Sequence, residues 1–310
     1  MRRMALAMLA VSVLGGCAAP GSNDDNGQDL AAIYADMALG HMQRQPPDYL
    51  RAKEKLEKAL EADPNLVRAH HYAAELYART DEPAKAEHHF RQAMELAPRD
   101  PNLKNNFGAF LCARNRYPEA EEQFLAAIGD PAYTTPQLAY ENLARCALRA
   151  PNAAKAERYF NEALKRQPNL PVSLFHMAQL QYDKREYFKA RAFLERYLGV
   201  GAATPQVLLL AVHIEKALGD SAMVAHYAQE LRSNFPDSSE AAALREILSK
   251  PGPEAGHPSK PLEVQVSEEV LRRQEGAVED EASTTTQPPA AAAPTETNNQ
   301  TSAGGADRPQ

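Results

Sequence analysis

The side chains best suited to chemistry in this sequence are three cysteines and two pairs of adjacent histidines. The histidine doublets are His70-His71 and His88-His89. Adjacent side chains on a helix point in different directions, so neither doublet is a ready-made chelator. No cysteine or carboxylate spacing typical of a zinc site accompanies them. We therefore predict no metal site here, and we expect packed or solvated helix histidines.

The sequence also lacks the other common catalytic patterns. It contains no glycine-rich phosphate loop, no nucleophile elbow and no zinc-protease motif. Its many carboxylates fall on predicted helix faces beside lysine and arginine, which is the usual pattern of a solvated surface. The net charge of -7 and the lack of an arginine- or lysine-rich patch argue against a nucleic-acid partner. We predict a protein that is not an enzyme and takes no cofactor, no metal and no small-molecule substrate.

Cys17 ends a short segment that has the order of a bacterial targeting signal. Arg2 and Arg3 make its start positive, and residues 5–13 form an apolar run that is too short to span a bilayer. Residues 14–17, Leu-Gly-Gly-Cys, resemble a lipobox, in which the cysteine thiol receives a diacylglyceryl group and becomes the new first residue. The alternative is an ordinary secretory signal with a chance cysteine. The order of charge, apolar run, small residues and cysteine favours the lipobox.

The predicted lipid would anchor the protein to a membrane. Several acyl chains on Cys17 would hold it firmly, whereas one chain alone would not. Ala18 follows the cysteine, so the aspartate that signals inner-membrane retention in the enteric pattern is absent. We predict a signal peptide at residues 1–16, a lipidated tether at 17–30, and a location on the periplasmic face of the cell outer membrane.

A 34-residue repeat must position the remaining side chains. From Ile33 to about Ser238, an alanine is followed by a bulky apolar residue four positions later, an alanine three after that and a proline five further on. This spacing matches the tetratricopeptide repeat (TPR), a helix–turn–helix unit. The small residues let the two helices approach, and the proline starts the next helix, where its missing N–H costs nothing. The best-kept anchors are Ala52, Leu56, Ala59 and Pro64, then Ala86, Phe90, Ala93 and Pro98, and later Ala156, Phe160, Ala163 and Pro168.

These repeats predict an all-α fold, a right-handed α-solenoid of six TPR helix pairs at residues 31–250. One repeat cannot bury its apolar stripe alone, so neighbours must stack. A short helix at 240–248 is expected to cap the end, with Ser238 or Ser239 as its N-cap. Residues 251–310 contain no aromatic residue and are rich in Pro, Ala, Thr, Glu and Gly. They cannot bury enough apolar surface to fold, so we predict a disordered acidic tail there.

Cys112 and Cys146 are the two cysteines that remain after lipidation. Both are expected late in the first helices of adjacent repeats, and these helices run side by side. An oxidising periplasm and an even number of cysteines favour a disulfide. The bridge requires Cα atoms within about 7 Å of each other. The alternative is a pair of buried thiols that pack as small hydrophobic groups.

We expect a protein-binding groove along the first helices of the repeats. The predicted lining mixes aromatic, aliphatic and amide groups, which suit an apolar segment with exposed backbone. The alternative for each residue is packing against the adjacent repeat. A lysine-and-asparagine clamp for a C-terminal carboxylate is not evident. The predicted groove residues are Tyr34, Met37, His71, Asn102, Asn105, Leu138, Glu141, Phe175, Gln179 and Tyr182.

The whole arrangement resembles the type IV pilus biogenesis/stability lipoproteins, the PilF/PilW group of pilotins. The resemblance extends over residues 17–248. Its most specific stretch is Asn-Asn-Phe-Gly-Ala-Phe-Leu-Cys at 105–112, followed by Arg-Tyr-Pro-Glu-Ala at 116–120. Cys146 falls where the second cysteine of the family would. The long acidic tail is not part of the common pattern of the family.

The resemblance implies a protein that helps the pilus secretin reach the outer membrane and multimerise there, as pilus biogenesis and twitching motility require. An acyl anchor would address the complex to that membrane, while the groove would shield an aggregation-prone segment of the secretin. The repeats by themselves indicate only a protein that binds other proteins. The alternative is a periplasmic TPR scaffold lipoprotein that serves outer-membrane protein assembly or cell-wall synthesis.

Overall fold

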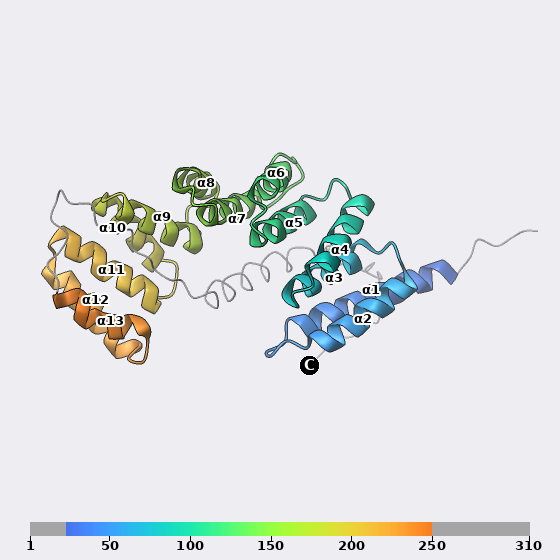
Figure 1. The fold of residues 1–310 in the computed structure, drawn as a ribbon, viewed down its shortest axis with the longest axis horizontal. Coiled ribbons are helices and arrows are strands. Elements are labelled where there is room, and N and C mark those ends of the chain that lie inside the picture. Colours follow the sequence, from blue (N-terminus) through green and yellow to red (C-terminus); the bar gives the residue numbers. More distant parts are fainter. Residues whose placement is uncertain (1–22, 250–310) are drawn as a thin grey trace, which may run out of the picture. The chain divides into compact units, whose positions relative to one another are not determined.

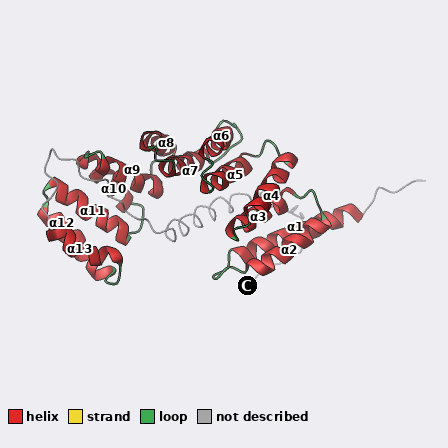
Figure 2. Cartoon of the chain, viewed as in Figure 1, coloured by secondary structure: helices red, strands yellow, loops and turns green. Residues whose placement is uncertain are grey.

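Thirteen α-helices and no strand make up residues 23–249, the part of the chain that the computed structural model describes (Figures 1 and 2). All of these residues belong to one compact unit. None of the described helices is both long enough and apolar enough to cross a membrane. The helices are α1 (Asn23–Met42), α2 (Tyr49–Ala62), α3 (Val67–Arg79), α4 (Pro83–Leu96), α5 (Pro101–Ala113), α6 (Tyr117–Ile128), α7 (Pro136–Arg149), α8 (Ala153–Arg166), α9 (Pro171–Asp183), α10 (Tyr187–Leu198), α11 (Pro205–Leu218), α12 (Ser221–Asn234) and α13 (Ser239–Ser249).

The first twelve helices form six hairpins, and each hairpin packs on the next. The strongest packing joins α1 to α2, α3 to α4, and so on to α11 and α12, while weaker packing links successive pairs. We call the odd-numbered members the A helices and the even-numbered members the B helices. The last helix, α13, packs against α11 and α12. The predicted solenoid of six TPR pairs with a terminal capping helix is therefore confirmed.

Capping residues in the sequence determine where several helices begin and end. The Asp48 carboxylate accepts a hydrogen bond from the backbone N–H of Arg51, 3.1 Å away, at the start of α2. Proline occupies the first turn of α4, α5, α6, α7, α9 and α11, where no helical hydrogen bond is lost. Gly219 ends α11 with φ 78°, a left-handed conformation that glycine adopts without strain.

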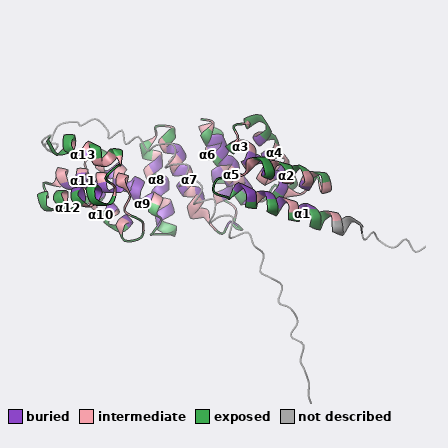
Figure 3. Ribbon diagram, turned by 90° about the horizontal axis from the view of Figure 1, so that it is seen from below, coloured by how far each residue is buried: buried purple, intermediate pink, exposed green. Residues whose placement is uncertain are grey.

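The repeat anchors form the core between helices (Figure 3). Ala86 and Ala120 are fully buried, and the rings of Phe90, Phe124 and Phe160 fill the space beside such alanines. Burying a large apolar side chain contributes roughly 1.5–3 kcal/mol, so this periodic set is a main source of stability. The anchor spacing therefore predicts both the elements and their packing.

The two ends of the solenoid, the start of α1 and the capping helix α13, differ in how well the sequence predicted them. The α1 helix begins at Asn23, so the predicted tether at 17–30 is wrong for its second half. Burial of Ala31 and Ala35 against neighbouring helices explains why α1 is held as a helix. The capping helix, predicted at 240–248, spans Ser239–Ser249. The Ser238 hydroxyl accepts a hydrogen bond from Ala241 N–H at 3.1 Å, as expected of its N-cap. The predicted signal peptide, Cys17 and the tail at 251–310 lie outside the described residues.

Candidate protein-binding surface

The predicted groove residues all lie on A helices, but they differ widely in exposure. Met37 and Asn102 are exposed to solvent. Asn105, Glu141 and Phe175 are buried, so their predicted role as groove-lining side chains is wrong. The other five predicted groove residues are partly exposed: Tyr34, His71, Leu138, Gln179 and Tyr182.

Asn105 lies between two A helices, and its amide makes hydrogen bonds within the protein. The Asn105 side chain is only 8% exposed. Its Nδ2 donates to Asn106 Oδ1 at 3.1 Å, and its Oδ1 accepts from Asn142 Nδ2 of α7 at 3.2 Å. A buried amide must find partners inside the fold. Its hydrogen bonds therefore join repeat 3 to repeat 4, where the sequence predicted contact with a partner.

Glu141 and Phe175 occupy the matching position in the next two repeats and are also buried. The Glu141 carboxylate on α7 accepts from the Ser173 backbone N–H of α9 at 3.0 Å and from its hydroxyl. The Phe175 ring contacts the rings of His176 and Tyr197. Glu141 therefore faces the next repeat, whereas Phe175 packs within its own helix pair, α9 and α10. The repeat count gave the correct register along the helix but the wrong direction for these side chains.

His71 continues this row of inter-repeat contacts toward the N-terminus. Its Nε2 lies 2.9 Å from Glu75 Oε1 and 2.8 Å from Asn106 Nδ2 of α5. Burial opposes ionisation of Glu75, but the charge of His71 and its hydrogen bond outweigh burial and lower the pKa of Glu75. Polar side chains thus join four successive A helices, from α3 to α9. We call this set of contacts the polar ladder.

The α1 helix carries a row of large apolar side chains on its solvent side. Leu30 is 44% exposed, Ile33 is 55% exposed and Met37 is 42% exposed. Their spacing of three and then four residues places them on one helix face. A side chain at Gly40, one turn further, would meet no atom within 4 Å, so this face stays open. We call Leu30, Ile33 and Met37 the α1 stripe.

The α1 stripe lies on a different face of α1 from the one that packs against the rest of the protein. Small residues, Ala31, Ala35 and Ala38, are fully buried on that other face. Within the described residues no A helix precedes α1, so no earlier repeat packs against the stripe. Asp29 and Asp36 lie exposed beside it, and Asp36 pairs with Arg68 at 3.4 Å. The sequence prediction found Met37 but missed Leu30 and Ile33, although the spacing was visible.

The other partly exposed groove residues rest on neighbours within the fold. Tyr34 packs beside buried alanines of the first two repeats, and Lys55 Nζ lies 5.8 Å from its ring centroid. Tyr182 contacts the rings of Tyr187 and His213. Burial raises the pKa of Tyr182 to about 12, so this phenol stays protonated at neutral pH. These side chains contribute surface without forming a continuous apolar face.

The cysteine prediction is confirmed, and the histidine doublets meet in an unexpected way. Cys112 of α5 and Cys146 of α7 form a disulfide, with Cα atoms 5.8 Å apart and a sequence separation of 34. One member of each doublet, His70 and His89, lies within hydrogen-bond distance of the other. No group of three potential metal ligands occurs among the described residues.

Known proteins of similar sequence share this architecture. No family model matches the chain. A type IV pilus assembly protein, PilF of Pseudomonas aeruginosa, is 33% identical over 243 residues, which are 77% of this chain and 96% of that protein.

Two solved structures align over most of the described helices. A structure of Pseudomonas aeruginosa PilF superposes with a TM-score of 0.63 and 31% identity, and covers 72% of this chain and 99% of its own. The structure of PilW, described as a widely conserved type IV pilus biogenesis factor, gives a TM-score of 0.62 and 32% identity, with 70% and 98% covered. This chain therefore belongs to the PilF family of type IV pilus assembly proteins.

Proposed function

We propose that this chain is an outer-membrane lipoprotein that binds the secretin of the type IV pilus and promotes its localisation and multimerisation. Membership of the PilF family supports a role in type IV pilus biogenesis. The observation that carries the binding part of the proposal is the exposed α1 stripe. Large apolar side chains in a row on the surface of a protein often mark an interaction site.

The chemistry of the α1 stripe suits an apolar segment of a partner. A helix with apolar residues at matching spacing could lay that face on Leu30, Ile33 and Met37. The exposed carboxylates of Asp29 and Asp36 border the stripe and would favour a segment with basic flanks. Such contacts would cover apolar surface of the secretin that otherwise promotes aggregation.

The proposed anchor and the α1 stripe are close in sequence. The α1 helix begins at Asn23, a few residues after Cys17. Acyl chains on Cys17 would hold the stripe near the inner leaflet of the outer membrane, where the secretin must insert. Anchor and stripe together would raise the local concentration of secretin subunits at that surface.

The experiment replaces Ile33 and Met37 with serine together. This change removes apolar contact area and leaves the buried alanine face of α1 intact, so the variant should melt near the wild-type temperature. The matched control is Leu125→Ser, because Leu125 on α6 is 44% exposed and lies away from α1. Secretin multimers are measured by blotting unboiled membranes, and twitching motility is scored in parallel.

We expect fewer secretin multimers and less twitching in the double variant, and normal amounts in the control. Normal multimers in a folded double variant would overturn the assignment of the stripe. If deletion of the whole protein leaves secretin multimers normal but depletes other outer-membrane proteins, the secretin proposal itself fails. That result would favour the scaffold function instead.

A further inference from the structure

One member of each histidine doublet meets its counterpart across the α3–α4 hairpin. His70 Nδ1 lies 3.0 Å from His89 Nδ1. Their ring centroids are 5.2 Å apart, with 40° between the ring planes. His70 is buried and His89 is half-buried, so the pair lies at the edge of the repeat with access to solvent from the His89 side. Neither the polar ladder nor the α1 stripe includes these two rings.

The backbone fixes the tautomer of His70. Its Nε2 lies 2.9 Å from the carbonyl oxygen of Pro64. A carbonyl oxygen only accepts hydrogen bonds, so Nε2 carries the hydrogen and donates it. The Nδ1 lone pair of His70 is then directed at His89. Metal-binding histidines are commonly held in this way, with the distal N–H on a backbone carbonyl.

Two aromatic side chains hold the His89 ring in place. The ring stacks on Tyr77 with 13° between the planes, and His88 meets it edge-on. These contacts keep the ring beside His70, with its Nδ1 at the Nδ1 of that residue.

We propose that His70 and His89 form a two-histidine clamp for a divalent transition metal ion, Cu²⁺ or Ni²⁺. Metal–nitrogen bonds are about 2.0–2.1 Å long, so two nitrogens that start 3.0 Å apart need only small movements to share one ion at an angle of roughly 90–100°. Right angles between ligands are typical of tetragonal Cu²⁺ and of Ni²⁺.

Binding requires a small local rearrangement and no net change in protonation. Without metal, His89 Nδ1–H donates to His70 Nδ1. On binding, that hydrogen moves to His89 Nε2 through solvent, and small rotations of both rings turn the Nδ1 lone pairs toward the ion. The described residues supply no third ligand in a metal-binding group, so water completes the coordination. The ion would pin α3 to α4 within repeat 2.

The test titrates full-length protein purified from membranes with Cu²⁺ and Ni²⁺, followed by calorimetry and by electron paramagnetic resonance for copper. We expect one ion per chain and nitrogen hyperfine structure from two imidazoles. His89→Gln should weaken binding at least tenfold, and His70→Gln should do the same. Because His70 is buried, its variant is checked by melting, and His89→Gln remains decisive if His70→Gln is unfolded. Ni²⁺ should bind at least as tightly as Zn²⁺.

Two neighbouring histidines supply matched controls. His88→Gln changes the exposed member of the same doublet, and His226→Gln changes an exposed histidine of α12. Both controls should retain wild-type affinity. Unchanged affinity in a folded His89→Gln variant would overturn the proposal. A spectrum with one coordinated imidazole, or a loss caused equally by His88→Gln, would also overturn it.

Discussion

Small residues at single positions determine how closely the two helices of a TPR pair can approach. Ala86 and Ala120 have no exposed surface. A Cβ atom added to Gly108 would lie 3.0 Å from the Phe124 ring, so this glycine is needed for close contact between α5 and α6. The phenylalanine that follows each alanine by four residues fills the space beside it. These positions tolerate little added volume.

Replacing Ala86 with arginine tests this packing directly. The change would overpack the contact between α3 and α4 and bury an unpaired charge, so we expect a loss of several kcal/mol in the free energy of unfolding. Thermal melting and urea titration measure the loss. The control is Ala84→Arg, two residues earlier on the same helix at an exposed position, which should melt near the wild type. Equal stability of the two variants would show that the register is wrong.

The buried histidine of α9 should make stability depend on pH. His176 is 8% exposed and its ring stacks on Phe160, and burial together with the charge of Arg145 lowers its pKa to about 4. Unfolded histidine has a pKa near 6.5, so between pH 6.5 and 4 the unfolded chain binds more protons than the folded chain. The free energy of unfolding should therefore fall as pH drops through this window, by on the order of 3 kcal/mol from this group.

Urea denaturation between pH 7.5 and 4 measures this slope. His176→Phe removes the titrating group while it keeps an aromatic ring beside Phe160, so the slope should become shallower. His226→Phe is the control, because His226 is exposed on α12 and should leave the slope unchanged. An identical slope in wild type and His176→Phe would rule out this histidine as a source of acid sensitivity.

Side-chain direction is the part of the candidate site that the sequence could not supply. The repeat assignment placed Cys112 and Cys146 late in adjacent A helices, and the structure joins them by a disulfide. The same assignment placed Asn105 and Phe175 at equivalent positions, but it could not show that both side chains point into the protein. The direction in which a side chain points depends on the rotation of its helix about the helix axis. That rotation is set by packing between neighbouring repeats, so the sequence of one repeat does not determine it. Exposure of Ile33 likewise follows from its place on the first A helix.

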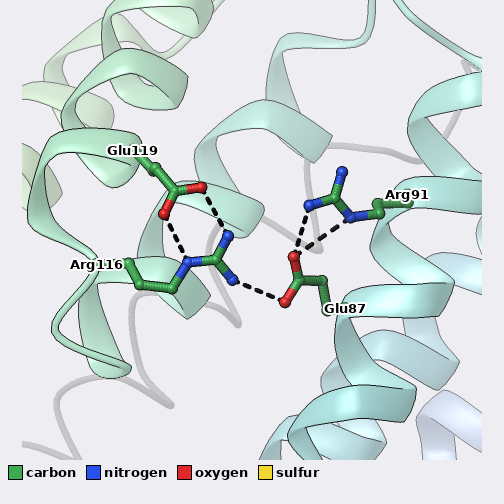
Figure 4. A network of polar contacts seen from close by, with 4 residues as sticks. All are labelled: Glu87, Arg91, Arg116 and Glu119. Atoms are coloured by element: carbon green, nitrogen blue, oxygen red, sulfur yellow. Dashed lines mark hydrogen bonds and ion pairs between the residues drawn. The ribbon is translucent and has the colours of Figure 1, made fainter.

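At the scale of elements, charged side chains join successive repeats on the B-helix side. Glu87 of α4 accepts hydrogen bonds from Arg91 of its own helix and from Arg116 at the start of α6, and Arg116 also pairs with Glu119 (Figure 4). Hydrogen bonds from Arg116 lower the pKa of Glu87 against the effect of burial. Such partly exposed pairs contribute little each, about 0–1 kcal/mol.

An ion pair between α10 and α11, which also joins two repeats, differs because one partner is buried. Glu215 is 2% exposed, and Arg191 Nε donates to its Oε1 at 2.9 Å. Replacing Arg191 with methionine would leave a buried carboxylate without its ion pair, so we expect a loss of roughly 3–5 kcal/mol. Arg116→Met should cost much less, because that network is partly exposed. Chemical denaturation compares the two variants.

A double replacement separates loss of the ion pair from loss of packing. Arg191→Met with Glu215→Leu removes both charges, so much of the stability lost in the single variant should return. If the double variant is as unstable as Arg191→Met, then the arginine contributes by packing and the buried charge is not the cause. The sequence shows that Arg191 and Glu215 carry opposite charges, but it does not show which carboxylate of the protein is buried.

Helix identity was predictable from the sequence because pattern and capping agree. The alanine and phenylalanine anchors, the prolines at helix starts and Gly219 all fall where the helices begin, pack or end. The start of α1 was missed because residues 23–30 are rich in Asn, Asp and Gly, which are weak helix formers. Tertiary contacts of the following alanines stabilise the helix despite that composition.

At the scale of the whole solenoid, each repeat contacts mainly its neighbours. Stability is then approximately a sum of repeat terms and interface terms. The disulfide between Cys112 and Cys146 joins repeats 3 and 4 near the middle of the array. A covalent link between neighbours opposes separation of the array at that interface. The polar ladder crosses the same interface through Asn105 and Asn142.

Breaking this bridge should weaken the centre of the array. Closing a loop of this length contributes roughly 2–4 kcal/mol, so Cys112→Ser with Cys146→Ser should lower the melting temperature. Thiol labelling of the unfolded, unreduced protein should modify neither cysteine, and labelling after reduction should modify both. Labelling of both before reduction would show that the native protein carries free thiols. Hydrogen exchange should show the greatest loss of protection in α5 and α7.

The last prediction concerns how an anchor and a binding surface work together in one molecule. Cys17→Ser removes the proposed acylation site without touching any described helix, so the solenoid should keep its melting temperature. The α1 stripe should remain intact, and the variant should still bind secretin in solution. Fractionation should find the wild type in the outer membrane and the variant elsewhere. Secretin multimers should fall in the variant, because bound subunits would no longer be delivered to the membrane. If the variant still sediments with the outer membrane, the anchor is not the lipid.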